Sequence, residues 1–414
     1  MAYITGQTVH GCSTPAKYLG GNTYECAPDV GEFYKKHRIY NDYHMWYAKV
    51  TGEVGETVTV RLKWPQFDPD AVSAEYRAWA TYSADWPSFF YALHEVLYIS
   101  TDELTWEHID GARVEGDTVV FTVTLTTGTA YLSATLHYTE ALYKALRSEL
   151  SASPYAETIC LGKGWGGADI LTFAVTDPSV PNEGKKTVYY QGLQHCHEST
   201  GGHVCDYMLR YLISDAPKAR ELRRRFIFRI TPVVDVGGWK HGHQTHPARE
   251  GSIDFNFNRD WGVFEVPEVR AIAKYLDTLK ANGEDLVMLA DLHGATGDEN
   301  DYSSGASCFA DDLGEDIVIR ERLDRQSVFG DMVVAECDYL NPSGKLGFWI
   351  RKAKPDGQFA MYAQKVWGPA YTFEISMSKI WDRAAGRRFP NSQAAYRRFA
   401  EQLLSVIGRF FLKD

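Results

Sequence analysis

The sequence lacks the features that mark membrane, secreted and repeat proteins. It has no run of 18 apolar residues, so no helix is expected to span a membrane. The first residues, MAYITGQTVHGC, contain neither a basic stretch nor an apolar core, so no signal peptide is expected. Internal repeats and low-complexity segments are absent as well. These absences predict a globular protein of the cytoplasm.

The cysteines are too scattered to form a disulfide or zinc framework. They are odd in number, contain no CxxC pair, and stand at positions 12, 26, 160, 196, 205, 308 and 337. Disulfide-rich secreted domains and structural zinc knuckles both need closely spaced, paired cysteines. The pattern therefore indicates reduced thiols.

An excess of positive charge is also missing. The net charge is −11, which argues against nucleic acid or an anionic membrane as a partner. What the chain does have is apolar and aromatic material, at 44% and 14% of its residues. With 414 residues, it is long enough for two domains with separate cores.

Residues 1–150 read as an all-β domain. Short alternating segments such as TVTVRLKW (57–64) and TAYLSATLHYT (129–139) are rich in β-branched and aromatic residues. A hairpin is expected within 112–125, where Gly116 and Asp117 stand between two strand-like runs. About five such strands predict a small β-sandwich, followed by a helix over 140–150 that Thr139 caps.

From residue 151 to residue 414 the pattern changes to strands that alternate with helices. Strands are expected over 169–176, 186–193, 225–234 and 285–294, and helices over 201–213, from Pro267 onward, and over 392–412. This alternation predicts an α/β domain with a mixed central sheet flanked by helices. Ligands gather at the carboxyl ends of the strands in such sheets.

Ionisable residues stand where these apolar runs end. His195-Cys196-His197-Glu198 follows one strand, His293 follows another, and Glu374 follows the strand-like GPAYTF. A histidine and a glutamate three residues apart converge if the chain turns there, and a distant histidine would complete a His₂Glu zinc site with an open position. The residues alone leave His195 and His197 both open as ligands. They also leave open a hydrogen-bonded cluster without a metal.

Four short motifs in a fixed order resemble those of the zinc carboxypeptidases, in their cytosolic branch. They are HCHE (195–198), REGSIDFNFNRDW (249–261), ADLHG (290–294) and AYTFE (370–374). The amino-terminal domain, with its Tyr-rich strand and short helix, resembles the domain that precedes the catalytic domain in this branch. The similarity covers about residues 40–410.

The resemblance implies a site and a reaction. It implies one zinc ion held by His195, Glu198 and His293, with Cys196 and His197 outside the ligand set. It implies Glu374 as the general base and Arg249 as the side chain that stabilises the oxyanion. Asn258 and Arg259 would bind the terminal carboxylate of a peptide or protein tail, the expected substrate.

Some features depart from the family or allow another function. HCHE replaces the usual HPGE or HAxE, Asp235-Val-Gly-Gly238 replaces an Asn-Pro-Asp-Gly turn, and Tyr362 is only a weak match to the family's mobile tyrosine. Lys345, Arg351, Lys352 and Lys354 would favour an acidic C-terminal residue if they line the pocket, or form a surface loop if they do not. The acidic run at 297–304 either shapes the entrance or pairs with these cations. The alternative functions are a zinc amidohydrolase acting on N-acyl amino acids or peptidoglycan stem peptides, and a binding protein without catalysis.

Overall fold

A computed structural model shows two compact units in the chain. It describes residues 2–11, 13–29, 46–63, 96–241, 256–295, 306–314, 317–338, 347–352, 357–382 and 384–412. The first unit comprises Met1–Leu142, Gly237–Phe255 and Thr296–Glu299, and the second comprises Tyr143–Val236, Asn256–Ala295 and Asn300–Asp414. Each is described by itself below. The domain boundary expected after residue 150 stays a prediction.

Among its described residues, the first unit contains two five-stranded sheets, as expected for a β-sandwich. One sheet has the order β1-β4-β10-β6-β7 and the other has the order β2-β3-β5-β9-β8. The strands of the first sheet are β1 (Tyr3–Thr5), β4 (Tyr47–Thr51), β10 (Thr129–Ser133), β6 (Tyr98–Ser100) and β7 (Glu107–His108). Those of the second are β2 (Lys17–Gly20), β3 (Thr23–Cys26), β5 (Thr57–Lys63), β9 (Thr118–Thr124) and β8 (Arg113–Glu115).

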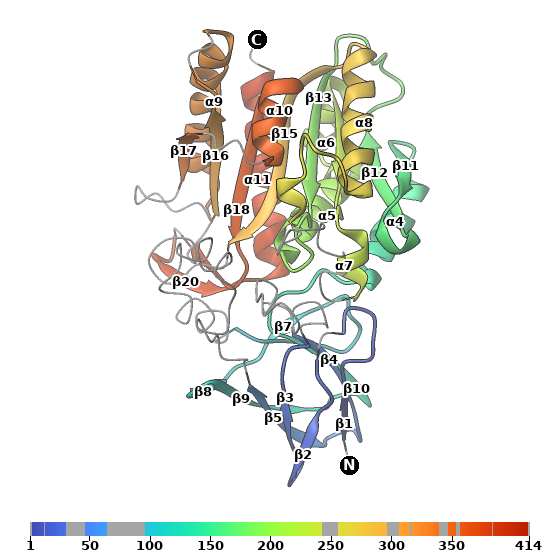
Figure 1. Cartoon of the computed structure of the whole chain (residues 1–414), viewed down its shortest axis with the longest axis vertical. Helices are drawn as coiled ribbons and strands as arrows, with labels where there is room; N and C mark the ends of the chain where they lie inside the picture. The colour runs from blue at the N-terminus through green and yellow to red at the C-terminus, as the bar shows by residue number, and fades with distance from the viewer. Residues whose placement is uncertain are drawn as a thin grey trace. The chain divides into compact units, whose positions relative to one another are not determined.

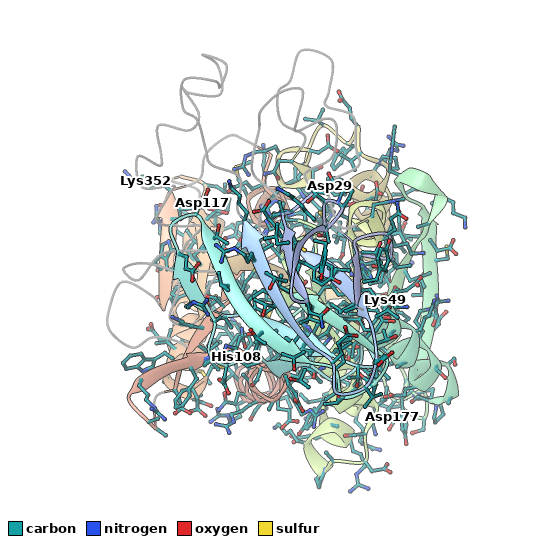
Figure 2. The ribbon with its side chains drawn as sticks, turned by 90° about the horizontal axis from the view of Figure 1, so that it is seen from below. Asp29, Lys49, His108, Asp117, Asp177 and Lys352 are labelled. Carbon is teal, nitrogen blue, oxygen red and sulfur yellow. The ribbon has the colours of Figure 1, made fainter. Side chains whose placement is uncertain are left out.

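Both sheets contribute to one apolar core. Val58, Val60 and Leu62 alternate along β5 and are fully buried, and they share the core with Ala48 and Val50 of β4. This period of two is what a strand with one buried face requires. Figure 2 looks onto these strands, with Lys49 of β4, His108 of β7 and Asp117 of the β8–β9 turn labelled.

The predicted hairpin and helix cap are present in this region, but one strand is shorter than predicted. Strands β8 and β9 pair antiparallel around Gly116 and Asp117. Strand β10 ends at Ser133, so the expectation of a strand to residue 139 is wrong. The Thr139 hydroxyl instead accepts a hydrogen bond of 3.1 Å from the Leu142 amide, as in an N-cap, and α4 (Glu140–Ala152) follows. Residues 134–138 therefore connect β10 to α4 rather than extending the strand.

The second unit contains an eight-stranded mixed sheet of order β11-β12-β14-β13-β15-β18-β16-β17. Its strands are β11 (Ala156–Lys163), β12 (Asp169–Val175), β14 (Phe226–Thr231), β13 (Lys186–Gly192), β15 (Asp285–Ala295), β18 (Ala370–Ser376), β16 (Ala306–Asp312) and β17 (Phe348–Lys352). The central strands β14, β13, β15 and β18 are mutually parallel. Their carboxyl ends therefore lie along one edge of the sheet.

Helices cover both faces of this sheet, so the predicted fold class is confirmed. In Figure 1, α8 (Pro267–Ala281) and α10 (Phe359–Val366) lie in front of the sheet, and α5 (Ser199–Ile213) and α11 (Gln393–Phe411) lie behind it. The other regular elements are α6 (Pro217–Arg225), α7 (Val236–His241), α9 (Ile317–Glu336), the short 3-10 turns η2 (Trp165–Gly167) and η3 (Phe257–Arg259), and the hairpin β19 (Lys379–Asp382) with β20 (Arg387–Pro390). Over the described residues, none of the helices combines the length and apolar character needed to cross a bilayer.

Candidate metal centre

His195 and Glu198 stand in the turn that connects β13 to α5. The strand ends at Gly192, and the helix begins at Ser199 with Glu198 as its N-cap. A hydrogen bond of 3.1 Å from the Glu198 amide to the His195 carbonyl tightens the turn. The two side chains therefore converge, as the spacing of three residues predicts.

His293 and Glu374 approach the same place from the neighbouring strands. His293 lies near the end of β15, next to β13, and Glu374 lies on β18 as the register partner of His293. His293 is 2% exposed and Glu374 is half-buried. The parallel register of three strands thus brings residues 195, 198, 293 and 374 to one edge of the sheet.

The donor atoms of His195, Glu198 and His293 form a compact set. His195 Nδ1 lies 2.9 Å from Glu198 Oε1, and His293 Nδ1 lies 2.8 Å from Glu198 Oε2. One donor atom from each residue lies within 4.8 Å of the other two. Tetrahedral zinc, with ligands at about 2.0–2.2 Å, holds its donor atoms about 3.3 Å apart.

Each histidine has a second partner on the ring nitrogen that faces away from this set. His195 Nε2 lies 2.9 Å from Asn256 Oδ1, and His293 Nε2 lies 2.6 Å from Asp291 Oδ2. Both oxygens can only accept, so each Nε2 donates a proton to one of them. Each Nδ1 is then the nitrogen that binds a cation, once it has lost any proton that it shares with Glu198. Histidines that bind zinc are usually held in this way. The donor set therefore fits the metal that the sequence predicts.

The pKa values of Glu198, His293 and Glu374 are shifted in different directions by burial and by neighbouring charges. Burial opposes the charge of Glu198, but the His195 and His293 imidazoles hold the pKa of Glu198 well below its usual range. Burial also opposes protonation of His293, but Asp291 and Glu198 raise the pKa of His293 well above its usual value. Burial raises the pKa of Glu374 to about 7, and Glu198 adds to this increase. A carboxyl group with this pKa suits a general base.

Asn258 and Arg259 lie in the short turn η3, directly after Asn256. Asn258 is 8% exposed, its Oδ1 accepts a 2.8 Å hydrogen bond from the Phe359 amide, and its Nδ2 lies 3.1 Å from His293 Nε2. The Arg259 guanidinium donates to the Asn258 carbonyl at 2.7 Å and has no carboxylate partner among the described residues. Asp260 instead accepts hydrogen bonds from the Glu265 and Val266 amides.

The remaining predicted residues do not add to the described cluster. Arg249, Lys345, Lys354 and the acidic run at 297–304 lie outside the described residues. His197 Nε2 is 4.0 Å from Glu198 Oε1, and its ring stacks on the His195 ring. Tyr362 packs against Phe264 and Trp367.

Two of the other residues expected near the pocket are described. Arg351 is paired with buried Asp311 at 2.9 Å and lies over the Phe309 ring. Lys352 is exposed. The charge of Arg351 is therefore already balanced.

Asn256 and Asp291 were missed by the sequence analysis, although signals for both existed. Asp291 and His293 are two residues apart on one strand, so their side chains lie on the same face. Asn256 and Asn258 have the same spacing in the FNFNR segment. Polar residues repeated at this spacing around a candidate ligand indicate its hydrogen-bond partners.

One known family model matches part of the chain. Residues 143–264 match the family model described as zinc carboxypeptidase. This segment includes His195, Glu198, Asn258 and Arg259. His293 and Glu374 lie beyond its end.

Curated relatives are similar over about half of the chain. Cytosolic carboxypeptidase 6 of Mus musculus is 27% identical over 251 residues, which are 59% of this chain and 43% of that protein. Cytosolic carboxypeptidase 1 of Danio rerio is 26% identical over 207 residues, which are 46% of this chain and 18% of that protein. The chain therefore spans less than half the length of these relatives.

Solved structures share the fold over the whole chain. A metallo-carboxypeptidase from Burkholderia cenocepacia has a TM-score of 0.73 at 18% identity, with 100% of both chains covered. A metallo-carboxypeptidase from Pseudomonas aeruginosa, in complex with (2-guanidinoethylmercapto)succinic acid, has a TM-score of 0.68 at 16% identity, with 99% of both chains covered. At this identity the likeness concerns the fold.

Proposed function

We propose that this chain, whose residues 143–264 match the zinc carboxypeptidase family model, is an enzyme that removes C-terminal amino acids from peptides or protein tails. The observation that carries the proposal is the His195–Glu198–His293 set with the Glu374 carboxyl group on the adjoining strand. Two imidazoles, one carboxylate and a nearby proton acceptor are the side chains that hydrolytic zinc chemistry requires.

His195 and His293, each through Nδ1, and the Glu198 carboxylate would hold the zinc ion. When bound, zinc supplies a water of lowered pKa and polarises the scissile carbonyl. Asn256 and Asp291 would keep the two imidazoles in the tautomer that leaves Nδ1 free of a proton.

Glu374 would act as the general base. Its carboxylate would take a proton from the attacking water and deliver it to the leaving amine. The pKa of about 7 supports this role, because the group can both accept and return a proton near neutral pH.

Substrate orientation would come from the arginines. Arg259 has no carboxylate partner in the described part of the chain, and its planar guanidinium suits a terminal carboxylate. Asn258 would assist through Nδ2, because its Oδ1 already accepts from Phe359. Arg249 would stabilise the oxyanion that forms on the scissile carbonyl.

The substrate class is proposed from the relatives' names and the local charges. The curated relatives are named cytosolic carboxypeptidases, which supports a cytoplasmic location and a peptide or protein tail as substrate. A preference for acidic C-terminal residues would depend on Lys345, Lys352 and Lys354, because Arg351 is neutralised by Asp311.

Two measurements test the proposal. The purified protein should contain about one zinc ion per chain, and it should cut peptides with a free C-terminal carboxylate in preference to amidated ones. Cleavage of N-acyl amino acids or peptidoglycan stem peptides instead would favour an amidohydrolase. Zinc binding without hydrolysis of either group of substrates would favour a binding protein.

A further inference from the structure

A buried polar network lies against His293, and the proposed reaction does not use it. It consists of Asp291, Gln191 and Gln194, which are at most 1% exposed. Gln191 of β13 is the register partner of Asp291 on β15, and Gln194 follows β13 by two residues. We call these three residues the Asp291 network.

The Asp291 carboxylate accepts hydrogen bonds from three nitrogens. His293 Nε2 lies 2.6 Å from Oδ2, Gln194 Nε2 lies 2.8 Å from the same oxygen, and Gln191 Nε2 lies 3.1 Å from Oδ1. No lysine or arginine pairs with Asp291 in the described part of the chain. A buried carboxylate is costly without positive charge nearby, so its most direct counter-charge is the His293 imidazole.

A hydrogen bond to the amide oxygen fixes the orientation of each glutamine side chain. Trp261 Nε1 donates to Gln194 Oε1 at 2.6 Å, and the Tyr189 hydroxyl donates to Gln191 Oε1 at 3.1 Å. Each amide oxygen is therefore occupied, and each NH₂ group must face Asp291. The network thus presents a carboxylate, rather than an amide or a water, to His293.

The second histidine of the metal centre is held differently. His195 Nε2 donates to Asn256 Oδ1, which also accepts from the Asn258 amide at 2.8 Å. The partner of His195 is therefore neutral, whereas the partner of His293 is negatively charged. A carboxylate partner makes an imidazole a more basic ligand, and removal of such partners typically weakens metal binding about 10–100-fold.

We propose that Asp291, fixed by Gln191 and Gln194, is the positioning residue that makes His293 the stronger of the two imidazole ligands. The inference rests on the proposed metal centre. According to this inference, the neutral partner of His195 and the charged partner of His293 give the two ligands different strengths of metal binding. The competing explanation is that the Asp291 network only stabilises the core between β13 and β15.

The test moves the charge without breaking the hydrogen bonds. In Asp291→Asn alone, the NH₂ group of the new asparagine would face the NH₂ group of Gln191. Two buried donors without an acceptor would destabilise the fold. The double variant Asp291→Asn/Gln191→Glu avoids this conflict. The new Asn NH₂ can donate to the new glutamate, which can still accept from Tyr189, while the Asn oxygen keeps its contacts with His293 and Gln194. The negative charge then lies on residue 191, one hydrogen bond further from His293.

Zinc affinity is measured by competition with a chelator, and metal-free stability is measured by thermal unfolding, at one fixed pH. We expect the double variant to bind zinc about 10–100-fold more weakly than wild type. Its metal-free form should stay folded at the assay temperature, with a lower melting temperature because the buried charge has moved away from His293. Asn256→Asp is the matched control, because it adds a carboxylate behind His195. It should bind zinc at least as tightly as wild type.

Three outcomes would overturn the inference. The first is a double variant whose zinc affinity stays within about twofold of wild type, and the second is an equal loss of affinity in Asn256→Asp. The third is a wild-type chain that binds no zinc, which would remove the proposed metal centre and the proposed function as well. Because the readout is zinc affinity, a failure to hydrolyse peptides would count against the proposed function alone.

Discussion

Glu198 and Glu374 are carboxyl groups at the same edge of one sheet, yet their pKa values move in opposite directions. Two imidazoles contact Glu198 and hold its pKa down, whereas burial raises the pKa of Glu374 to about 7. One carboxylate is thus suited to bind a cation and the other to exchange a proton. Environment rather than residue type separates the two roles.

Glu374→Gln should separate metal binding from hydrolysis. The amide is nearly isosteric but cannot accept a proton, so we expect the zinc content to stay the same and kcat to fall about 10²–10⁴-fold. Metal analysis and peptide assays of the same preparation measure both. Near-normal turnover would remove Glu374 from the mechanism.

Zinc affinity should fall as the pH decreases from about 8 to about 6, because protons compete for the imidazoles. The pKa of His293 is raised well above its usual value, so the metal-free protein carries a proton there that zinc must displace. Each displaced proton makes the apparent dissociation constant about tenfold larger per pH unit. Calorimetry in buffers of different ionisation enthalpy counts the released protons. An affinity independent of pH would contradict the protonated state of His293.

The metal-free protein should show the matching change in stability. A histidine with a raised pKa stabilises the fold below its unfolded pKa of about 6.5, and this contribution is lost as the pH rises through the folded value. Glu374 acts in the same direction, because its pKa is raised to about 7 from 4.5. Denaturant unfolding with a chelator present should therefore give lower stability at about pH 8 than at about pH 6. The reverse order would show that other groups dominate.

Arg259→Ala should reduce the discrimination between free and amidated C-termini. If Arg259 binds the terminal carboxylate, its loss removes a charge-assisted pair, and kcat/KM for free-acid peptides should fall about 10²-fold or more. Amidated peptides should be affected much less. Exposed Arg220→Ala, on α6, is a control for general loss of positive charge. Equal losses for both peptide types would reject the carboxylate-binding role.

At the element scale, strand β15 shows how closely the backbone must approach the site. A Cβ on Gly294 would lie 2.7 Å from Met377 Sδ and 3.0 Å from Glu198 Cβ. The Met377 side chain would have to move away from the first contact. The second contact is so tight that β15 and the turn before α5 would have to shift apart by a few tenths of an ångström. The glycine therefore keeps His293 and Glu198 within reach of one ion.

Gly294→Ala should weaken zinc binding and lower the free energy of unfolding by about 1–3 kcal/mol through overpacking. Gly128→Ala is the matched control, because the nearest atom to its new Cβ is the Gly52 oxygen at 3.6 Å. Chelator competition and denaturant unfolding measure the two effects. Wild-type zinc affinity in Gly294→Ala would show that the turn relaxes without moving Glu198.

The elements that were best predicted from the sequence are those in which apolar residues recur with a clear period or a helix has a recognisable cap residue. The strands at β13 and β15 and the helices α5, α8 and α11 lie where the apolar pattern indicated. Helix α9 and strand β17 were missed. In α9 only Leu323, Gln326, Phe329, Gly330 and Val333 are buried, so its apolar stripe is narrow. Strand β17 is an edge strand without a fully buried residue, so it leaves little pattern to detect.

The same difference applies to the candidate site. His195, Glu198, His293 and Glu374 became candidates because they stand where apolar runs end. The resemblance to the zinc carboxypeptidases then favoured His195 over His197 and gave Glu374 its role. The partners Asn256 and Asp291 depend on which strands are neighbours, and strand order is set by packing of the whole sheet. Sequence spacing indicates that Asp291 and His293 share a face, but it does not reveal that Gln191 pairs with Asp291 across two strands.

At the scale of the whole molecule, the chain has two compact units, and the candidate metal centre belongs to one of them. The core of the first unit is formed by residues such as Trp46, Val60 and Phe121, all before residue 142. His195, Glu198 and His293 all belong to the second unit. Zinc should therefore stabilise the second unit directly.

Hydrogen exchange with and without zinc tests this expectation. A ligand present at 100 times its dissociation constant stabilises the state that binds it by about 2.7 kcal/mol. Amides of β13 and β15 that exchange by unfolding of the second unit should therefore slow by about 100-fold, whereas those of β5 and β9 should change little. The Asp291→Asn/Gln191→Glu variant, at the same zinc concentration, should show a smaller effect confined to the same strands. Equal slowing in both units would show that they unfold as one cooperative body, and the metal would then stabilise the amino-terminal sheets as well.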